Sequence, residues 1–327
     1  EVNGKAIHCH DLNDLNRCLS SYENDGRQQP VLLWLGNSQL HAINQYKLGE
    51  ETAASEIHRR FQTKGDYFLT LSQPNANLQE HYLLFSYIFN QLPLEMLVLP
   101  VVFDDMRDDG IRTSLSKALN DQNTTSSLRY SSIGQSLIAN YGEQDAAGND
   151  MAALDGTVQK KTEKKLNELL NEIWPIWAER PTLRGNFFNW LYQFRNWSLR
   201  IDPSSTRKMI HGRYKKNKDA LTALLDFAKI QKIKVLVYIA PLRNDVKIPY
   251  NPEEYEMFKS EIKKIALKSN ANFLNLENLV PGQLWGTKES TTIGIEQELD
   301  FMHFQAGGHG LLAEELYEAI TMIRSIP

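Results

Sequence analysis

The chain has 327 residues, of which 42% are hydrophobic and 23% are charged, and its formal net charge is −4. These values are typical of a globular protein with a sizeable core, and they exclude collagen-like, disulfide-dense and wholly disordered classes. The slight acidic excess argues against binding to nucleic acid. No run of about 18 apolar residues is present, so we expect no transmembrane span in the sequence.

The first 30 residues are polar and are predicted to form an arm with one helix near Asp11–Ser21. This arm contains the two cysteines of the chain, Cys9 and Cys18. Their spacing fits no common zinc motif; they are either a disulfide that closes a small loop, which would imply an oxidising compartment, or two free thiols. His8 and His10 flank Cys9, but no further ligand lies nearby in the sequence, so we predict no metal site.

Continuous apolar runs, each ended by turn residues, predict strands of a parallel sheet that is covered on both faces. These runs are, in chain order, 31–35, 67–71, 94–99, 233–239 and 272–276. Helical periodicity predicts helices at 40–60, 78–90, 219–231, 252–268 and 308–323. The alternation of strands and helices predicts an α/β fold with an open parallel sheet and helices on both faces.

Residues 104–218 interrupt this alternation, and we interpret them as an insertion within a single α/β domain of residues 31–327. The polar stretch 119–157 predicts a long excursion from the sheet, and 158–201 predicts helix. An aromatic stripe in the second stretch is expected to pack on the core, with a membrane-surface or partner-binding helix as the alternative. Its members are Phe187, Trp190, Leu191, Phe194 and Trp197.

Three residues that could form a nucleophile, a base and an orienting acid lie next to predicted elements. Ser38 follows the first predicted strand, and Asp300 and His303 precede the last predicted helix. Functional groups gather at the carboxyl ends of strands in open α/β sheets. A serine needs a base to take its proton, and a carboxylate usually holds that base in the right tautomer. We therefore expect Ser38 Oγ within a few ångströms of one His303 nitrogen, with Asp300 on the other; taken alone, Ser38 would be a helix N-cap and His303 a capping or packing histidine.

The two motifs together resemble those of the SGNH (GDSL-type) hydrolase superfamily. They are Gly36-Asn37-Ser38 after a strand and Asp300-Phe301-Met302-His303 before the final helix. The resemblance implies a flavodoxin-like three-layer fold with Ser38 as nucleophile, His303 as base and Asp300 as the orienting residue. It also implies that no metal or organic cofactor is needed.

The sequence departs from the superfamily pattern at the residues that stabilise an oxyanion. Asn37 stands where the family usually has Asp, and no Gly-x-Asn-Asp block follows the third predicted strand. Asn75 or Asn77, one strand earlier, could supply the missing amide donor, although both also fit a turn. Asn37, Arg107 and Arg243 are further candidates for substrate binding, with a structural ion pair as the alternative for Arg243.

The helical insertion makes the chain resemble a divergent branch that includes D-alanyl transfer proteins and polysaccharide O-acetyltransferases. The resemblance implies a serine-dependent acyl-ester hydrolase or acyltransferase acting on an envelope or secreted polysaccharide. Expected partners are an acylated polysaccharide or small acyl ester and a membrane acyltransferase. The expected location is periplasmic or extracytoplasmic, with an anchor upstream of Glu1. A catalytically silent module that binds polysaccharide or scaffolds a membrane acyltransferase is the alternative, favoured by the missing Gly-x-Asn-Asp block.

Overall fold

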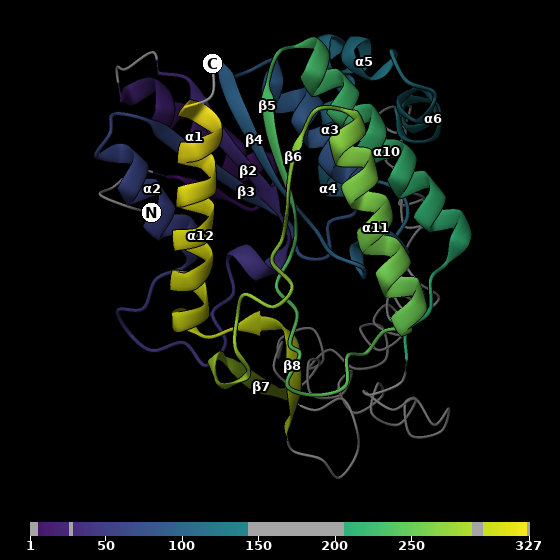
Figure 1. Cartoon of the computed structure of the whole chain (residues 1–327). Helices are drawn as coiled ribbons and strands as arrows, with labels where there is room; N and C mark the ends of the chain where they lie inside the picture. Colours follow the sequence, from purple (N-terminus) through teal and green to yellow (C-terminus); the bar gives the residue numbers. More distant parts are fainter. Residues whose placement is uncertain (1–5, 26–28, 143–205, 290–296, 326–327) are drawn as a thin grey trace, which may run out of the picture.

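A computed structural model describes residues 6–25, 29–142, 206–289 and 297–325. Its centre is a six-stranded sheet with the order β1-β3-β2-β4-β5-β6, in which every neighbouring pair is parallel (Figure 1). The α/β class with an open parallel sheet is therefore confirmed. The strands are β1 (His8–Cys9), β2 (Val31–Gly36), β3 (Tyr67–Ser72), β4 (Leu94–Val101), β5 (Lys234–Ile239) and β6 (Asn272–Asn275).

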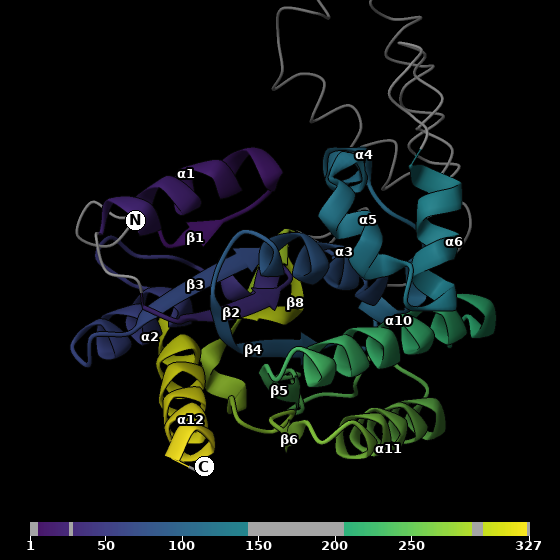
Figure 2. The ribbon, with the colours of Figure 1, turned by 90° about the horizontal axis from the view of Figure 1, so that it is seen from above.

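Helices cover both faces of this sheet because successive side chains of a strand point to opposite sides. In β2, Leu33 and Leu35 belong to one buried cluster, whereas Leu32 and Trp34 belong to the other. Figure 2 shows α2 and α12 apart from α10 and α11. Four helices contribute buried side chains to the first cluster: α1 (Leu12–Asn24), α3 (Leu78–Phe89), α10 (His211–Ile230) and α11 (Pro252–Lys268). Two helices contribute to the second: α2 (Ala53–Gln62) and α12 (Ala306–Ser325). Among the helices of the described residues, none has the length and hydropathy needed to cross a bilayer.

The predicted strands all form, but the predicted helix at 40–60 is wrong. A short 3-10 helix, η1 (Ser38–Leu40), follows β2, and α2 begins only at Ala53. Gln45 and Gly49 have φ values of 53° and 93°, a left-handed conformation that ends helical backbone. Thr52 then caps α2 by accepting a hydrogen bond from the Ser55 N–H. The loop between η1 and α2 contacts β8, where the Asn44 N–H donates to the Phe304 carbonyl.

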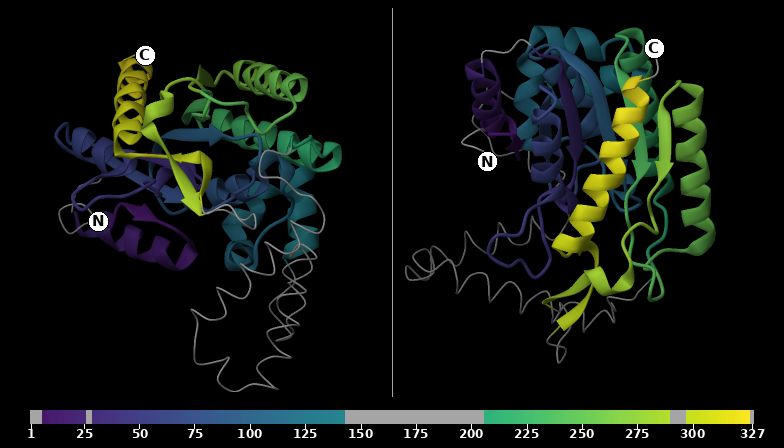
Figure 3. Two further views of the ribbon diagram at one scale, coloured as in Figure 1. Left: turned by 90° about the horizontal axis from the view of Figure 1, so that it is seen from below. Right: turned by 60° about the vertical axis from the view of Figure 1, so that its left-hand side comes forward.

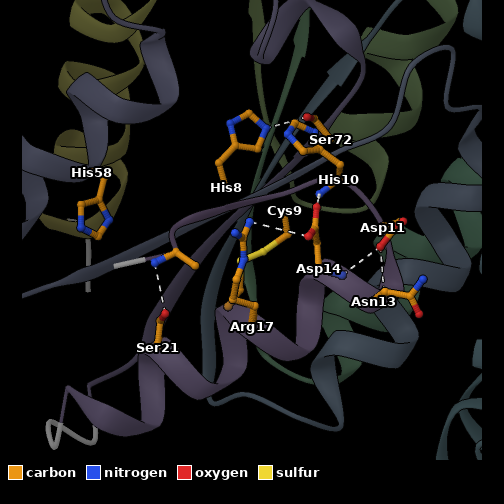
Figure 4. The surroundings of a disulfide bond; sticks show 12 residues. His8, Cys9, His10, Asp11, Asn13, Asp14, Arg17, Ser21, His58 and Ser72 are labelled. Atoms are coloured by element: carbon orange, nitrogen blue, oxygen red, sulfur yellow. Dashed lines mark hydrogen bonds and ion pairs between the residues drawn. A yellow bond between two sulfur atoms is a disulfide. The ribbon is translucent and has the colours of Figure 1, made fainter. Parts of the chain in front are cut away.

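The N-terminal residues are part of the fold rather than a lead-in arm. β1 pairs with the edge of β3, and α1, close to the predicted helix, packs its buried side chains into the larger core cluster. A disulfide joins Cys9 in β1 to Cys18 in α1 (Figure 4). By the chain-entropy relation, a loop of this length stabilises the folded state by about 3 kcal/mol. The disulfide therefore fastens the outermost strand to its covering helix.

The segment 113–142 of the insertion is mostly helical, and this includes the described part of the polar stretch 119–157, for which the composition predicts a long excursion. It contains α4 (Thr113–Ser116), η3 (Lys117–Asn120), α5 (Gln122–Leu128) and α6 (Ser132–Tyr141), preceded by η2 (Asp105–Arg107). Asp121 and Ser131 cap α5 and α6, while Leu128 and Leu137 are buried in the core cluster. The predicted aromatic stripe and the helical prediction for 158–201 lie outside the described residues.

An antiparallel pair, β7 (Trp285–Glu289) and β8 (Gln297–Phe304), was not predicted by the sequence pattern. The pair lies at the end of the sheet where α12 begins, and Figure 3 shows it crossing that end. The β8 sequence mixes polar and apolar residues, and several of its side chains are only partly buried. It therefore lacks the continuous apolar run that predicts each central strand. The pair places Asp300 and His303 on a strand rather than in a loop.

His309 connects α12 to the first residue of α2 and to the loop that precedes α2. Its side chain is fully buried; Nδ1 accepts a hydrogen bond from the Ala53 N–H at 3.2 Å, and Nε2 lies 3.3 Å from the Ala42 carbonyl oxygen. Burial lowers the pKa of His309 to about 4, against the smaller effect of the Ala42 carbonyl. The folded protein therefore holds this imidazole neutral.

We predict an acid-induced loss of stability that His309 contributes to directly. An unfolded histidine titrates near pH 6.5, so the stabilisation is complete above that pH and falls as the pH drops toward 4. The share of His309 is on the order of 3 kcal/mol. Urea unfolding of the wild type and His309→Gln at pH 7, 5.5 and 4 should show a flatter pH dependence in the variant. Parallel curves would contradict the assignment.

Candidate active site

Ser38 lies where β2 ends and η1 begins, at the carboxyl edge of the sheet. Gly36 permits this tight exit, because a Cβ at that position would collide with the buried side chain of Leu40. Asn37 caps η1, its Oδ1 accepting a hydrogen bond from the Gln39 N–H at 3.0 Å. Ser38 itself remains half-buried, so its hydroxyl is both positioned and accessible.

A continuous chain of hydrogen bonds links Ser38, His303 and Asp300. Ser38 Oγ lies 2.9 Å from His303 Nε2, and His303 Nδ1 lies 3.0 Å from Asp300 Oδ2. The His303 side chain is 29% exposed, whereas that of Asp300 is 5% exposed. This is the arrangement of a hydroxyl, a base and an orienting carboxylate. The structure thus brings together the three residues that the two sequence motifs predicted.

Asp300 is held as a carboxylate by its surroundings. Burial by itself would raise its pKa, but the His303 ring and the backbone N–H groups of Met302 and His303 together outweigh burial and lower the pKa to about 2. Those N–H groups donate to Oδ1 at 2.8 and 3.1 Å. An ionised Asp300 accepts the Nδ1 proton of His303, which leaves the Nε2 lone pair facing Ser38.

Two carboxamides that the sequence analysis did not select support the triad. Asn44 Nδ2 donates to Asp300 Oδ2 at 3.1 Å, and the Asn44 backbone N–H donates to the Phe304 carbonyl at 2.9 Å. Gln39 Nε2 donates to the carbonyls of Pro241 and Met302, both at 3.0 Å, and so joins η1 to the loop after β5 and to β8. Neither residue belongs to a motif. Only their positions shortly after Ser38 in the sequence could have marked them as neighbours of the site.

Asn37, which stands where the superfamily usually has Asp, contacts Asp105 in the loop after β4, where the Gly-x-Asn-Asp block is missing. Asn37 Nδ2 donates to Asp105 Oδ2 at 2.7 Å, and both side chains are buried. Burial raises the pKa of Asp105 well above its ordinary value, with Asp104 adding to the effect and the Asn37 amide opposing it. Asn37 is therefore a structural residue, and its predicted role in substrate binding is corrected because its carboxamide is used within the protein.

The predicted oxyanion donors Asn75 and Asn77 have different surroundings. Asn77 is the N-cap of α3: its Oδ1 accepts from the Gln79 and Glu80 N–H groups, and its Nδ2 donates to the Gly110 carbonyl. Since this buried carboxamide serves the helix, the structure does not supply Asn77 to the site. Asn75 is exposed and has a φ of 53°, which suits a turn.

Gln73, which the sequence analysis did not select, has an amide nitrogen without a hydrogen-bond partner among the described residues. Its backbone N–H donates to the Gly36 carbonyl at 2.9 Å, directly beside the Ser38 turn. Arg112 Nη1 donates to Gln73 Oε1 at 3.2 Å, which fixes the orientation of the carboxamide. Gln73 Nε2 is buried and has no hydrogen-bond partner among the described residues. A buried donor of this kind is costly unless a ligand completes it.

The two arginines predicted to bind substrate, Arg243 and Arg107, have different surroundings. Arg243 forms two hydrogen bonds to Asp245, at 2.8 and 3.1 Å, and a third to the Gly286 carbonyl, so it is a structural ion pair rather than a substrate ligand. Arg107 also forms internal bonds, to Asp104 at 3.1 Å and to the Lys208 carbonyl at 2.9 Å, but it lines an open cavity of about 330 Å³ together with Asn75. The other residues that line this cavity are Asp104, Asp108, Arg207, Ile210 and Arg213.

No protein-family model matches the chain, and no curated protein matches it. Solved structures with a similar overall arrangement include esterase EstA from Pseudoalteromonas sp., at 11% identity and a TM-score of 0.44, covering 90% of this chain and 98% of that one. An acetylxylan esterase from Geobacillus stearothermophilus has 9% identity and a TM-score of 0.43, with coverages of 89% and 94%. A GDSL-like lipase from Bacteroides thetaiotaomicron has 12% identity and a TM-score of 0.41, with coverages of 92% and 95%.

The contact between Asn37 and Asp105 predicts strong coupling between the two positions. Asn37→Asp places two buried carboxyl groups side by side and should lose on the order of 2–3 kcal/mol of unfolding free energy. Asp105→Asn keeps an oxygen that can accept from Asn37 Nδ2 and should lose less. The double exchange Asn37→Asp with Asp105→Asn restores one donor and one acceptor and should recover most of the loss in Asn37→Asp. Urea unfolding at pH 7 measures the cycle; additive losses would contradict the pairing.

Proposed function

We propose that this protein is a serine-dependent acyl-ester hydrolase or acyltransferase that uses Ser38, His303 and Asp300. The observation that carries the proposal is the unbroken chain from Ser38 Oγ through the His303 ring to the Asp300 carboxylate, with distances of 2.9 and 3.0 Å. A structural role for Ser38 as a helix cap is not needed, because Asn37 already caps η1. The hydroxyl is therefore available for chemistry.

In the proposed reaction, Ser38 Oγ attacks the carbonyl carbon of an ester while its proton passes to His303 Nε2. The developing imidazolium is stabilised by the ionised Asp300. When the tetrahedral intermediate collapses, the ester C–O bond breaks and His303 gives its proton to the leaving alcohol. Water or a sugar hydroxyl then attacks the acyl-Ser38 with His303 as base, which returns free Ser38 and yields an acid or a new ester.

The negative charge that forms on the carbonyl oxygen needs hydrogen-bond donors. We assign this role to Gln73 Nε2, because the amide is buried, oriented by Arg112 and without a partner among the described residues. The superfamily pattern would take this donor from the loop after the third predicted strand, which here contains Asp104 and Asp105. A glutamine one strand earlier would replace it.

An extracytoplasmic polysaccharide is the substrate class that we propose. The disulfide between Cys9 and Cys18 is consistent with an oxidising compartment. The cavity beside η2 is polar, and Asn75 and Arg107 are its proposed contacts to a sugar. It is linked to the triad by Tyr250, whose hydroxyl donates to Asp104 at 3.1 Å and lies 3.9 Å from Met302 Sδ, next to His303. A membrane acyltransferase as donor partner remains part of the proposal.

Loss of the triad should abolish ester turnover without unfolding the protein. We expect Ser38→Ala and His303→Ala to reduce p-nitrophenyl acetate hydrolysis to background, and to equal degrees, because the two residues act as one unit. Asp300→Asn should lower the rate by up to about 10⁴-fold through the wrong imidazole tautomer. A fluorophosphonate probe should label the wild type and Ser114→Ala, an exposed-serine control, but not Ser38→Ala.

A different result would favour the non-enzymatic alternative. If the folded wild type neither hydrolyses the ester nor reacts with the fluorophosphonate, the chain is a catalytically silent module that binds polysaccharide or scaffolds a membrane acyltransferase. Labelling that persists in Ser38→Ala would instead move the nucleophile to another serine.

The oxyanion assignment makes a separate prediction for two neighbouring carboxamides. Gln73→Glu keeps the size of the side chain but removes the donor, so the turnover rate should fall by about 10²–10³-fold. Asn75→Ala, in the same loop, should leave the rate for a small ester within a few-fold of wild type. Steady-state kinetics with p-nitrophenyl acetate compares the two. A large loss in Asn75→Ala with none in Gln73→Glu would reverse the assignment.

A further inference from the structure

Three histidines from two distant parts of the chain meet beside the candidate active site. His8 is in β1, His10 follows β1 directly, and His41 follows η1. The ring centroids of His8 and His10, and of His10 and His41, are 4.9 Å apart, and those of His8 and His41 are 5.9 Å apart. One ring nitrogen from each histidine lies within 4.8 Å of the other two. The sequence offered only His8 and His10, and the fold adds the third imidazole.

This spacing is close to that of a three-histidine metal site. Zn²⁺ binds imidazole nitrogens at about 2.0–2.1 Å, so nitrogens on a tetrahedral ion are about 3.4 Å apart. The observed separations of up to 4.8 Å require small rotations of the rings. His10 is exposed, whereas His8 and His41 are half-buried, so the His10 ring has room to rotate.

Ser72 holds two of the three rings. Its buried Oγ lies 2.6 Å from His8 Nε2 and 2.8 Å from His41 Nδ1. Figure 4 shows the His8 ring directed at Ser72, beside His10. A hydroxyl carries a single proton, so it donates to only one of these two nitrogens at a time. Two imidazole nitrogens and a hydroxyl therefore converge on one small region, which offers a metal ion nitrogen and oxygen ligands.

The backbone around the cluster is fixed before any ligand binds. Cys9, between the two N-terminal histidines, is bonded to Cys18, and β1 pairs with β3 through His8 and Thr70. The hydrogen bonds between Ser72 and the rings of His8 and His41 further restrict where these two rings lie.

We propose that His8, His10 and His41 bind one divalent late-transition-metal ion of the Zn²⁺ class, with Ser72 or a water as the fourth ligand. Three neutral imidazoles select Zn²⁺, Cu²⁺ or Ni²⁺ over Mg²⁺ and Ca²⁺, which prefer oxygen ligands. The ion ties the N-terminal strand to the turn that carries Ser38, because the His41 N–H donates to the Ser38 carbonyl at 3.2 Å. The site is independent of the proposed hydrolase activity.

The test is isothermal titration of the full chain with Zn²⁺, after purification without a histidine tag and removal of metal with a chelator. We expect one Zn²⁺ per chain, a higher melting temperature in its presence, and no binding of Mg²⁺ or Ca²⁺. His10→Ala should weaken Zn²⁺ binding by more than roughly tenfold, the effect typical of losing even a supporting residue of a metal site. His211→Ala is the matched control, since His211 is also exposed but lies at the start of α10.

His10→Ala should keep the circular dichroism spectrum and the metal-free melting temperature of the wild type, because the ring is exposed. The proposal is overturned if the wild type binds no Zn²⁺, or if His10→Ala and His211→Ala bind it as tightly as the wild type. Equal weakening in both variants would also overturn it, since that result indicates dispersed binding to surface histidines.

Discussion

The hydrogen bond between Ser38 Oγ and His303 Nε2 joins residues 265 positions apart, and the candidate site depends on it. It forms because β2 and the β7–β8 pair meet at the same end of the sheet. The parallel arrangement fixes where β2 ends, and α12 fixes where β8 must stop. Gln39 then bonds η1 to the Met302 carbonyl, so the serine and the histidine cannot separate without breaking this partly buried hydrogen bond.

Carboxamides, more than charges, build the surroundings of this site. Asn37, Gln39 and Asn44 are all buried, and each bonds to a different neighbouring segment. A buried amide is stabilising only when its partners are in place, so these residues favour one arrangement of the loops over others. Gln73 differs from Gln39 and Asn44 in the kind of atom left without a partner among the described residues: Gln39 Oε1 and Asn44 Oδ1 are acceptors, whereas Gln73 Nε2 is a donor, and an oxyanion needs donors.

The N-terminal segment gives the site a second set of constraints. The disulfide between Cys9 and Cys18 fastens β1 at the sheet edge, and this strand brings two histidines to the loop after Ser38. One segment therefore contributes both a covalent link and potential metal ligands near the same turn. The sequence predicts a polar arm for this segment, whereas in the structure it pairs with the sheet and contacts the loop after Ser38.

The sequence by itself determined the central strands and both halves of the triad. Leu32–Leu35 and the other apolar runs predict buried strands because burial depends on local composition, and Gly36–Ser38 and Asp300–His303 are local motifs next to them. Only the tertiary structure decided the internal bonds of Asn37, Asn77 and Arg243, since each side chain equally fits a ligand contact in the sequence. Likewise, only the fold brought His41 to His8 and His10. A polar side chain takes its role from its partner, and these partners lie in segments that folding alone brings together.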